Sequence, residues 1–380
     1  EAIRQLGNEL PALHSIFIHL TLIPFIGSAG ELKTKPTQHS VKELMESGVS
    51  PDILVCRTEH HIGEDIKRKL ALFCNVDKEA IIESIDAETI YDVPNLMMKE
   101  GLHTVVMKKL GLKTEEKPIL TAWNKFLNNY KNPKETVEIG LVGKYIELQD
   151  AYKSILEALE HAGAHNQLRV NIHPIHSEDL NRKNVDEKLK GLHGLVVAPG
   201  FGDRGIEGKI IAVRYVREKG IPFMGICLGM QMAVIEYARN VLHLENANST
   251  EMSRGTPHPV IDIMEDQKMV TEKGGTMRLG AWDCRLEKGS KAYAIYGQEI
   301  ISERHRHRYE FNNDYLKMME DAGLKATGFN PKTGLVEIVE IEDHPWFVGV
   351  QYHPEYKSTV LNPHPLFMSF VKAASLHKGQ

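Results

Sequence analysis

The chain has 380 residues, of which 42% are hydrophobic and 26% are charged, the composition of globular domains with buried cores. At roughly 150 residues per domain, this length predicts two domains or one large domain with additions. The net charge of −5 disfavours nucleic-acid binding, which needs a broad positive excess. Four scattered cysteines without a Cys-x-x-Cys pair disfavour a disulfide framework and a structural zinc site, and no apolar run is long enough for a membrane span. We therefore expect a cytoplasmic chain, in a reducing compartment, without disulfides or a structural zinc site.

Residues 1–111 alternate short apolar runs with helical patterns. We predict strands at 16–26 and 53–56, and helices at 41–47, 65–72 and 102–110. Strands that alternate with helices predict an α/β domain with a mostly parallel sheet. The chain begins with an amphipathic stretch that leads at once into an apolar strand pattern, as though such a domain were entered partway. We therefore expect that an amino-terminal part precedes Glu1 in the natural protein.

Residues 112–136 are polar, contain two prolines and carry one short amphipathic piece, so we predict a linker there. A second α/β unit follows at 137–380, with apolar strands predicted at 137–142, 195–197, 223–226, 336–340 and 346–351. Helices are predicted at 152–162 and 209–219. The sequence thus predicts two α/β domains joined by a linker.

The segment 221–233 (IPFMGICLGMQMA) carries the clearest chemical signal. An apolar strand leads to Cys227, glycines stand two residues before and two residues after it, and a helix-forming run follows at once. This is a cysteine version of the sharp strand-to-helix turn that exposes a nucleophile. A helix N-terminus beside a thiol favours the thiolate and offers backbone N–H groups to an oxyanion. The alternative is a buried structural cysteine between two packing glycines.

A cysteine nucleophile needs a base, and the end of the last predicted strand supplies a histidine. His353 follows this strand and Glu355 stands two residues later, so the carboxylate could orient the imidazole ring toward a thiol. The chain has 19 histidines, so His-x-Glu alone is a weak signal. Combined with the turn at Cys227, it predicts a Cys-His-Glu triad.

The motifs GICLGMQ (225–231) and QYHPE (351–355) resemble those of class I glutamine amidotransferases. This resemblance implies a flavodoxin-like domain with a mostly parallel sheet over 137–380. Such a domain would hydrolyse glutamine through Cys227, His353 and Glu355 and pass ammonia to a second site.

Five further motifs narrow the resemblance to the CTP synthase family. They are KTKPTQHSVKEL (33–44), VGKYIELQDAYKS (142–154), ENANSTE (245–251), GGTMRLG (274–280) and ERHRHRYEFNN (303–313). The resemblance implies ATP-dependent amination of UTP to CTP with glutamine or ammonia, in pyrimidine nucleotide biosynthesis. It also implies Mg²⁺ and ATP as cofactors, GTP as an allosteric activator, CTP as a feedback inhibitor and a homotetramer. Residues 1–111 would then be the carboxy-terminal part of a P-loop-type synthetase (amidoligase) domain, whose phosphate loop and magnesium carboxylates would lie upstream.

The resemblance also assigns the residues that contact glutamine. They would be Gly200, Leu228, Gly229, Met230, Gln231, Glu251 and Arg308. Gly200 and Leu228 would offer backbone N–H groups to an oxyanion, and Glu251 suits an α-ammonium group. The run 304–308 could instead be a basic surface patch. The family loop usually has two adjacent glycines before its phenylalanine, whereas this chain has Pro199, which fixes φ and removes one N–H.

The nucleotide contacts in the first domain are likewise assigned by resemblance. UTP and CTP would contact Lys33, Thr34, Lys35, Pro36, Thr37, Gln38 and Lys69, and ATP would contact Ile85, Asp86 and Ala87. The residue pattern agrees, because two lysines just before a helix N-terminus suit a triphosphate. We predict that this helix starts at Ser40, with Ser40 and Glu43 as a capping box. The alternative is a solvated basic loop.

Two other functions compete with this interpretation. A different glutamine-dependent ligase or a stand-alone glutamyl hydrolase would keep the triad, but the motif at 33–44 disfavours it. A regulatory or filament-forming subunit on the same fold would not need an intact Cys227, His353 and Glu355. If the upstream part is absent, this chain should hydrolyse glutamine only and make no CTP.

Overall fold

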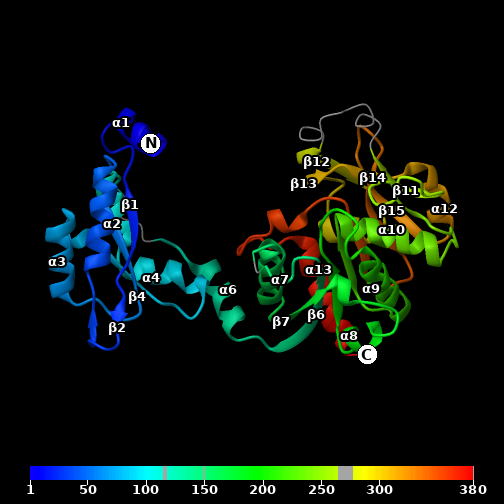
Figure 1. Ribbon diagram of the computed structural model, residues 1–380, viewed down its shortest axis with the longest axis horizontal. Helices are drawn as coiled ribbons and strands as arrows, with labels where there is room; N and C mark the ends of the chain where they lie inside the picture. Colours follow the sequence, from blue (N-terminus) through cyan, green and yellow to red (C-terminus); the bar gives the residue numbers. More distant parts are fainter. Residues whose placement is uncertain (114–117, 149, 264–276, 380) are drawn as a thin grey trace. The chain divides into compact units, whose positions relative to one another are not determined.

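The computed structural model describes residues 1–113, 118–148, 150–263 and 277–379 (Figure 1). It divides into two compact units, Glu1–Thr121 and Ala122–Gln380. Each unit packs helices on a central β-sheet, so the predicted α/β fold is confirmed. Within the described ranges, no helix is long and apolar enough to cross a membrane.

Three parallel strands form the main sheet of the first unit, in the order β1-β4-β5. In chain order the elements are α1 (Ala2–Glu9), β1 (Ile18–Leu22), β2 (Phe25–Ile26), β3 (Glu31–Leu32), α2 (Lys35–Glu46), β4 (Ile53–Thr58), α3 (Glu64–Cys74), β5 (Ile81–Ile85), α4 (Val93–Lys99) and α5 (Leu102–Lys109). The central strand β4 is covered on both faces, which is why its first four residues are all apolar. Leu54 and Cys56 pack with Val41 of α2 and Leu70 of α3, and the opposite face packs with α4 and α5.

Helix α2 begins at Lys35, five residues before Ser40, so the predicted helix start and capping box are wrong. Pro36 fits in the first turn of a helix, where its missing N–H costs no hydrogen bond. Ser40 lies inside the helix, and its hydroxyl is 2.9 Å from His19 Nε2. Lys35 is therefore part of the first helical turn rather than of a loop before it.

The segment predicted as a linker contains a helix. Within 112–136, residues 114–117 lie outside the described residues, and α6 (Thr121–Lys131) comes after them. Phe126 of α6 packs beside the rings of His161 and His165, with centroid distances of 6.1 and 5.9 Å. Most of this helix therefore belongs to the second unit.

Nine strands form the main sheet of the second unit, in the order β13-β12-β15-β16-β17-β9-β8-β6-β7, and a smaller sheet has the order β10-β11-β14. The elements are β6 (Glu135–Gly143), α7 (Lys153–His165), β7 (Leu168–His176), α8 (Val185–Leu189), β8 (Gly194–Val197), α9 (Ile206–Lys219), β9 (Phe223–Ile226), α10 (Leu228–Asn240), β10 (Asn248–Ser249), β11 (Pro259–Ile263), β12 (Arg278–Leu286), α11 (Lys291–Tyr296), β13 (Ile300–His307), β14 (Tyr309–Phe311), α12 (Leu316–Asp321), β15 (Leu324–Phe329), β16 (Val336–Ile341), β17 (Phe347–Val350) and α13 (Pro365–Lys378).

The two halves of this sheet differ in strand direction. Neighbours from β17 to β7 are parallel, whereas neighbours from β13 to β17 are antiparallel. Helices α9 and α10 cover one face of the parallel part, and α7 and α13 cover the other (Figure 1). Ligands of such sheets bind beyond the carboxyl ends of the parallel strands. The candidate nucleophile lies at that edge.

Candidate active site

Cys227 occupies a sharp turn between β9 and α10. β9 ends at the residue before it and α10 begins at the residue after it, and its backbone has φ +51° and ψ −104°. Non-glycine residues rarely adopt positive φ, and such strain is typical of functional side chains held in place by their surroundings. The flanking glycines are required sterically. A Cβ on Gly229 would lie 2.2 Å from the Val197 carbonyl oxygen, and one on Gly225 would lie 2.7 Å from the carbonyl carbon of Gly229.

His353 and Glu355 follow the neighbouring strand. β17 pairs with β9 in parallel, and Val350 stands opposite Ile226, so both chain segments leave the sheet at the same edge. His353 Nδ1 lies 2.7 Å from Glu355 Oε1, and both side chains are buried. Burial by itself favours the neutral ring, but the nearby Cys227 and the hydrogen bond and charge of Glu355 raise the pKa of His353 to about 11. The site therefore favours an imidazolium beside the sulfur.

A cavity of about 410 Å³ opens over the cysteine. Its lining residues are Tyr145, Ala151, Tyr152, Pro199, Gly200, Phe201, Cys227, Gln231, Glu251, Met277, Arg306, His307, Arg308, Tyr309, His353 and Tyr356. Four of the seven predicted glutamine contacts are among them, namely Gly200, Gln231, Glu251 and Arg308. The other three, Leu228, Gly229 and Met230, are buried in the first turn of α10. A ligand could meet that turn through its free backbone N–H groups.

The loop that follows β8 is held by charged side chains. Lys144 Nζ donates to the carbonyl oxygens of Phe201 and Gly202. Glu251 Oε1 accepts a hydrogen bond of 2.9 Å from the Gly202 N–H. Sequence reasoning assigned no role to Lys144, although it belongs to one of the motifs that carried the resemblance. Glu251 thus fixes this loop as well as lining the cavity.

Gly200 lies directly against the turn that carries the nucleophile. A Cβ on Gly200 would be 3.4 Å from Leu228 Cδ2. Gly200 therefore packs against Leu228, the first residue of α10 and the residue after Cys227.

Sequence reasoning missed Gln351, which contacts the sulfur. Its Nε2 lies 3.6 Å from Cys227 Sγ, and its Oε1 accepts from Gln231 Nε2 at 3.1 Å. Gln231 also donates to the Tyr309 carbonyl at 3.0 Å, so its amide nitrogen is engaged by the protein. The sequence feature that could have identified Gln351 is a polar residue at the end of a buried strand, two positions before His353.

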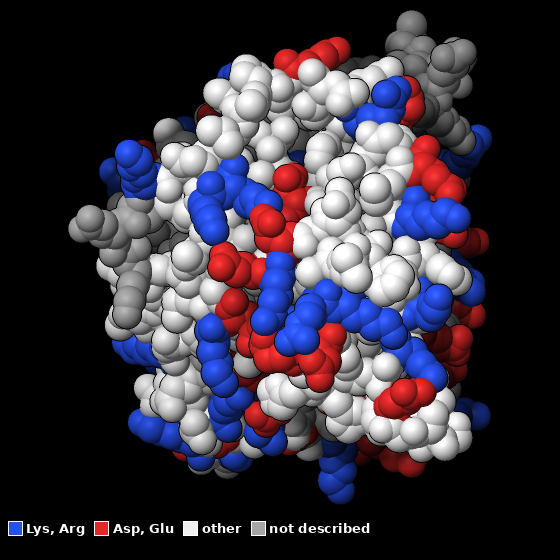
Figure 2. Space-filling view, turned by 90° about the vertical axis from the view of Figure 1, so that its left-hand side faces the viewer, with Lys and Arg blue, Asp and Glu red and all other residues white. Residues whose placement is uncertain are grey.

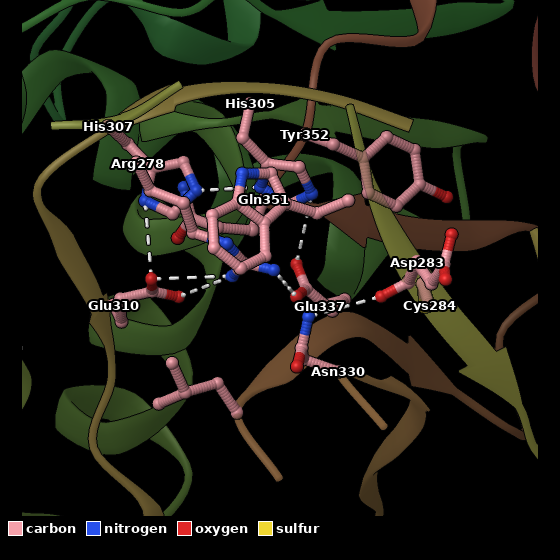
Figure 3. Close-up of polar contacts among 12 residues, drawn as sticks. Arg278, Asp283, Cys284, His305, His307, Glu310, Asn330, Glu337, Gln351 and Tyr352 are labelled. Carbon is pink, nitrogen blue, oxygen red and sulfur yellow. Dashed lines mark hydrogen bonds and ion pairs between the residues drawn. The ribbon is translucent and has the colours of Figure 1, made fainter. Parts of the chain in front are cut away.

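Five ionisable side chains form a buried cluster beside the cavity (Figure 3). They are Arg278, His305, His307, Glu310 and Glu337. Arg278 lies 2.5 Å from Glu337 and 3.4 Å from Glu310, and His305 Nδ1 lies 2.8 Å from His307 Nε2. In β13, His305 and His307 are buried, whereas Arg304 and Arg306 are exposed. The run 304–308 is therefore not a uniform basic surface patch.

One guanidinium cannot balance two buried carboxylates. Burial, only partly offset by Arg278, raises the pKa of Glu337 to about 7 and that of Glu310 to about 8. Burial and the Arg278 charge lower the pKa of His305 to about 2 and that of His307 to about 3. In the neutral range the folded state thus retains glutamate protons that the unfolded chain has lost, so stability falls as pH rises. Below about pH 6.5 the unfolded chain binds protons at His305 and His307 that the folded state does not bind, so these histidines make stability rise with pH there.

We therefore expect the free energy of unfolding to fall by on the order of 1 kcal/mol per pH unit between about pH 6.5 and 8. Glu337→Gln should flatten this dependence, because an amide has no proton to lose. Denaturant unfolding of both proteins at pH 6.5, 7 and 8 measures the slope. Glu342→Gln, at an exposed position, is the control and should keep it. An unchanged slope in Glu337→Gln would contradict this account of the cluster.

In the first unit, predicted UTP and CTP contacts gather near one acidic side chain. Lys33 Nζ is ion-paired with Glu31. The hydrogen bond and charge of Lys33, together with the charge of Lys69 from α3, lower the pKa of Glu31. Lys35 is exposed at the start of α2. The fold thus brings Lys33 and Lys69 together from different elements, beside the helix start that carries Lys35.

The remaining predicted contacts of this group shape the first turns of α2. Gln38 Nε2 donates to Thr34 Oγ1 at 3.0 Å, and Thr37 Oγ1 donates to the Leu22 carbonyl at 3.0 Å. Thr34 and Thr37 are buried, whereas Pro36 is exposed. These contacts stabilise the helix start and tie it to the end of β1.

The predicted ATP contacts, Ile85, Asp86 and Ala87, lie at the end of β5 and just after it. The Asp86 N–H donates to the Thr58 carbonyl at 3.0 Å, and its carboxylate accepts from Arg57 Nε at 3.0 Å. Among the residues that the structure describes, no group of three or more His, Cys, Asp or Glu side chains could hold a metal ion. We therefore assign no magnesium ligand to them.

Figure 2 shows Lys and Arg interspersed with Asp and Glu on the face it presents, without one continuous basic surface.

Comparisons with known proteins agree with the motifs. The family model of class-I glutamine amidotransferases matches residues 147–373, and that of the CTP synthase N-terminus matches residues 1–112. The CTP synthases of Flavobacterium psychrophilum and Christiangramia forsetii are both 66% identical to this chain, over 380 and 377 residues. The alignments cover 100% and 99% of this chain, and 71% and 69% of those proteins.

A solved structure agrees for the second unit. The glutaminase domain of Trypanosoma brucei CTPS with bound acivicin has 40% sequence identity and a TM-score of 0.60, covering 63% of this chain and 94% of that one. The resemblance drawn from the motifs is therefore confirmed. The match over 1–112 also argues against an unrelated glutamine-dependent ligase. The chain belongs to the CTP synthase family and carries that family's glutamine amidotransferase domain.

Proposed function

We propose that the second unit hydrolyses glutamine through Cys227, His353 and Glu355, and that the ammonia is used to aminate UTP to CTP with ATP. The observation that carries the proposal is the strained Cys227, held at the end of β9 beside a His353 that is paired with Glu355. The cavity above the sulfur supplies a substrate site. Neither a core cysteine nor a non-catalytic subunit would need this arrangement.

The geometry supports a two-step mechanism. The Cys227 thiolate attacks the side-chain amide carbon of glutamine, and the N–H groups of Gly200 and Leu228 stabilise the oxyanion that forms. The imidazolium of His353 gives its proton to the amide nitrogen, so ammonia leaves and a glutamyl thioester remains. His353 then takes a proton from water, which attacks the thioester and releases glutamate and the cysteine. Glu355 orients the ring and stabilises its charged form throughout.

We assign the amino-acid end of glutamine to Glu251 and Arg308, which line the same cavity. Glu251 supplies a carboxylate for the α-ammonium group, and Arg308 supplies a guanidinium for the α-carboxylate. Gln231 acts through Gln351, since its amide nitrogen already donates within the protein. Gly229 and Met230 contribute through the backbone of the first turn of α10.

For the first unit we propose the carboxy-terminal part of the synthetase domain, over residues 1–111, with 112–136 as its connection to the amidotransferase domain at 137–380. Lys33, Lys35 and Lys69 would hold the triphosphate of UTP or of the inhibitor CTP, with Thr34, Pro36, Thr37 and Gln38 forming the helix start beside it. Ile85, Asp86 and Ala87 would contact ATP. The enzyme would work as a homotetramer activated by GTP, as in the family.

Release of glutamate from glutamine tests the first part of the proposal. The full chain should produce glutamate and ammonia in equal amounts. An inert chain would contradict the proposal. A second assay distinguishes this function from that of a stand-alone glutaminase. It uses a protein with the full length of the curated relatives, and this protein should form CTP from UTP, ATP and glutamine.

Lys35→Ala tests the nucleotide assignment. A triphosphate carries about four negative charges, and each charge-assisted contact contributes on the order of 1.5–3 kcal/mol. The variant should therefore raise the UTP KM and the CTP inhibition constant at least tenfold, measured in the version of relatives' length. Lys42→Ala is the control, because Lys42 lies on the same helix and pairs only weakly with Glu46 at 3.7 Å. Unchanged UTP affinity with lost glutamine hydrolysis would mean that this helix start serves another role.

A further inference from the structure

Lys209 is a lysine without any solvent exposure in the middle of an amidotransferase core. It lies on α9 and its side chain is 0% exposed. Its Nζ donates a hydrogen bond of 2.7 Å to the carbonyl oxygen of Ala198, which follows β8. Lysines are almost never fully buried unless they are paired. Among the described residues, however, the Lys209 nitrogen has no ion pair with a carboxylate: its hydrogen bond goes to a carbonyl, and the charges that affect it are those of Lys144 and Cys227.

The surroundings of Lys209 make its charge costly. Burial, with a smaller contribution from the Lys144 ammonium, lowers the pKa of Lys209 to about 7, and Cys227 acts in the opposite direction. A methionine of similar length would fill the same space without this cost. Both the ammonium and the neutral amine can donate to Ala198, so the contact does not depend on the protonation state.

This contact lies next to the loop that follows β8 and carries Gly200, the proposed oxyanion donor. A Cβ on Gly200 would be 3.8 Å from Lys209 Nζ. The Ala198 carbonyl belongs to the peptide that precedes Pro199, so the Lys209 hydrogen bond fixes the plane of that peptide. Relative to this fixed peptide plane, the direction of the Gly200 N–H depends only on the φ and ψ angles of Pro199. The proline ring fixes φ, which leaves one soft dihedral.

We propose that Lys209 is a positioning residue for glutamine hydrolysis, which holds the Ala198 carbonyl and thereby directs the Gly200 N–H toward the oxyanion. This inference rests on the proposed glutaminase activity. Lys209 does not touch the substrate, and it acts only through the loop.

Lys209→Met is the test, with Lys219→Met as the matched control on the exposed end of the same helix. Glutamate release by the full chain gives kcat and the glutamine KM, and thermal unfolding gives Tm. Because an oxyanion donor acts only in the transition state, Lys209→Met should lower kcat about fivefold and leave KM within twofold. Its Tm should change little, because the desolvation cost of the buried amine is removed together with its hydrogen bond to Ala198.

Three results would overturn the inference: a kcat within twofold of wild type, a raised KM with an unchanged kcat, or a lower Tm that accompanies the lower kcat. The last would assign Lys209 to the fold alone. Cys227→Ala, assayed in parallel, separates this inference from the proposed function. If that variant is inert and Lys209→Met is fully active, only the Lys209 inference fails. If the wild type and every variant release no glutamate, both proposals fail.

Discussion

Replacing Cys227 with alanine should abolish glutamine hydrolysis and leave ammonia-dependent CTP formation near the wild-type rate. Alanine keeps the Cβ of the strained turn but removes the sulfur that would form the thioester. Loss of one triad member costs several kcal/mol of barrier, about a thousandfold or more in rate, because the triad acts as a unit. Added ammonium salt supplies the nitrogen donor directly. Glutamate release and CTP formation should both be measured, in a version with the full length of the curated relatives.

Cys284→Ala is the matched control for this experiment. Cys284 is buried in the same hydrophobic cluster as Cys227, and burial raises the pKa of its thiol. It lies on β12, away from the turn, so its removal should leave glutamine hydrolysis within a few fold of wild type. Glutamine hydrolysis that persists in Cys227→Ala would refute the triad. Loss of CTP formation with ammonia in that variant would instead point to damage beyond the glutaminase site.

The candidate site could be predicted from sequence where its chemistry is local. The turn at Cys227 is encoded by two glycines and an apolar strand within five residues, and the geometry explains both glycines. His353 could be placed because it ends a buried strand, and parallel strands of one sheet end at one edge. Gln351 and Lys209 could not be found in this way. Their roles depend on distances across the sheet and on burial, which a sequence pattern does not report.

The fold was predicted best where strands are apolar. β9 and β8 are buried on both faces, and their predicted bounds agree with the structure to within one residue. The antiparallel strands β12 and β13 were missed, because β13 reads Ile-Ile-Ser-Glu-Arg-His-Arg-His and its buried face is largely polar. Hydrophobic alternation cannot detect a strand whose inward side chains belong to an ionic cluster. The start of α2 differs from the prediction for another reason: a proline fits in the first turn of a helix as well as in a loop, and Pro36 lies in that first turn.

Glu355→Gln should lower kcat/KM for glutamine hydrolysis a hundredfold or more, without loss of the fold. Glutamine has the shape of glutamate, and its oxygen can still accept from His353 Nδ1, where the carboxylate now lies at 2.7 Å. It carries no negative charge, however, so it cannot stabilise the imidazolium that assists the thiolate and protonates the leaving nitrogen. If the amide nitrogen faces the ring instead, it also selects the wrong tautomer.

The pH profile separates this electrostatic role from a packing role. Glu355 is one of the groups that raise the pKa of His353, so its neutralisation should lower that pKa. The imidazolium would then lose its proton at lower pH, and the alkaline limb of kcat/KM should move toward neutrality. Glu342→Gln, exposed just after β16, is the control and should leave both the rate and the limb in place. A Glu355→Gln enzyme with a rate within threefold of wild type, or with an unmoved alkaline limb, would remove Glu355 from the mechanism.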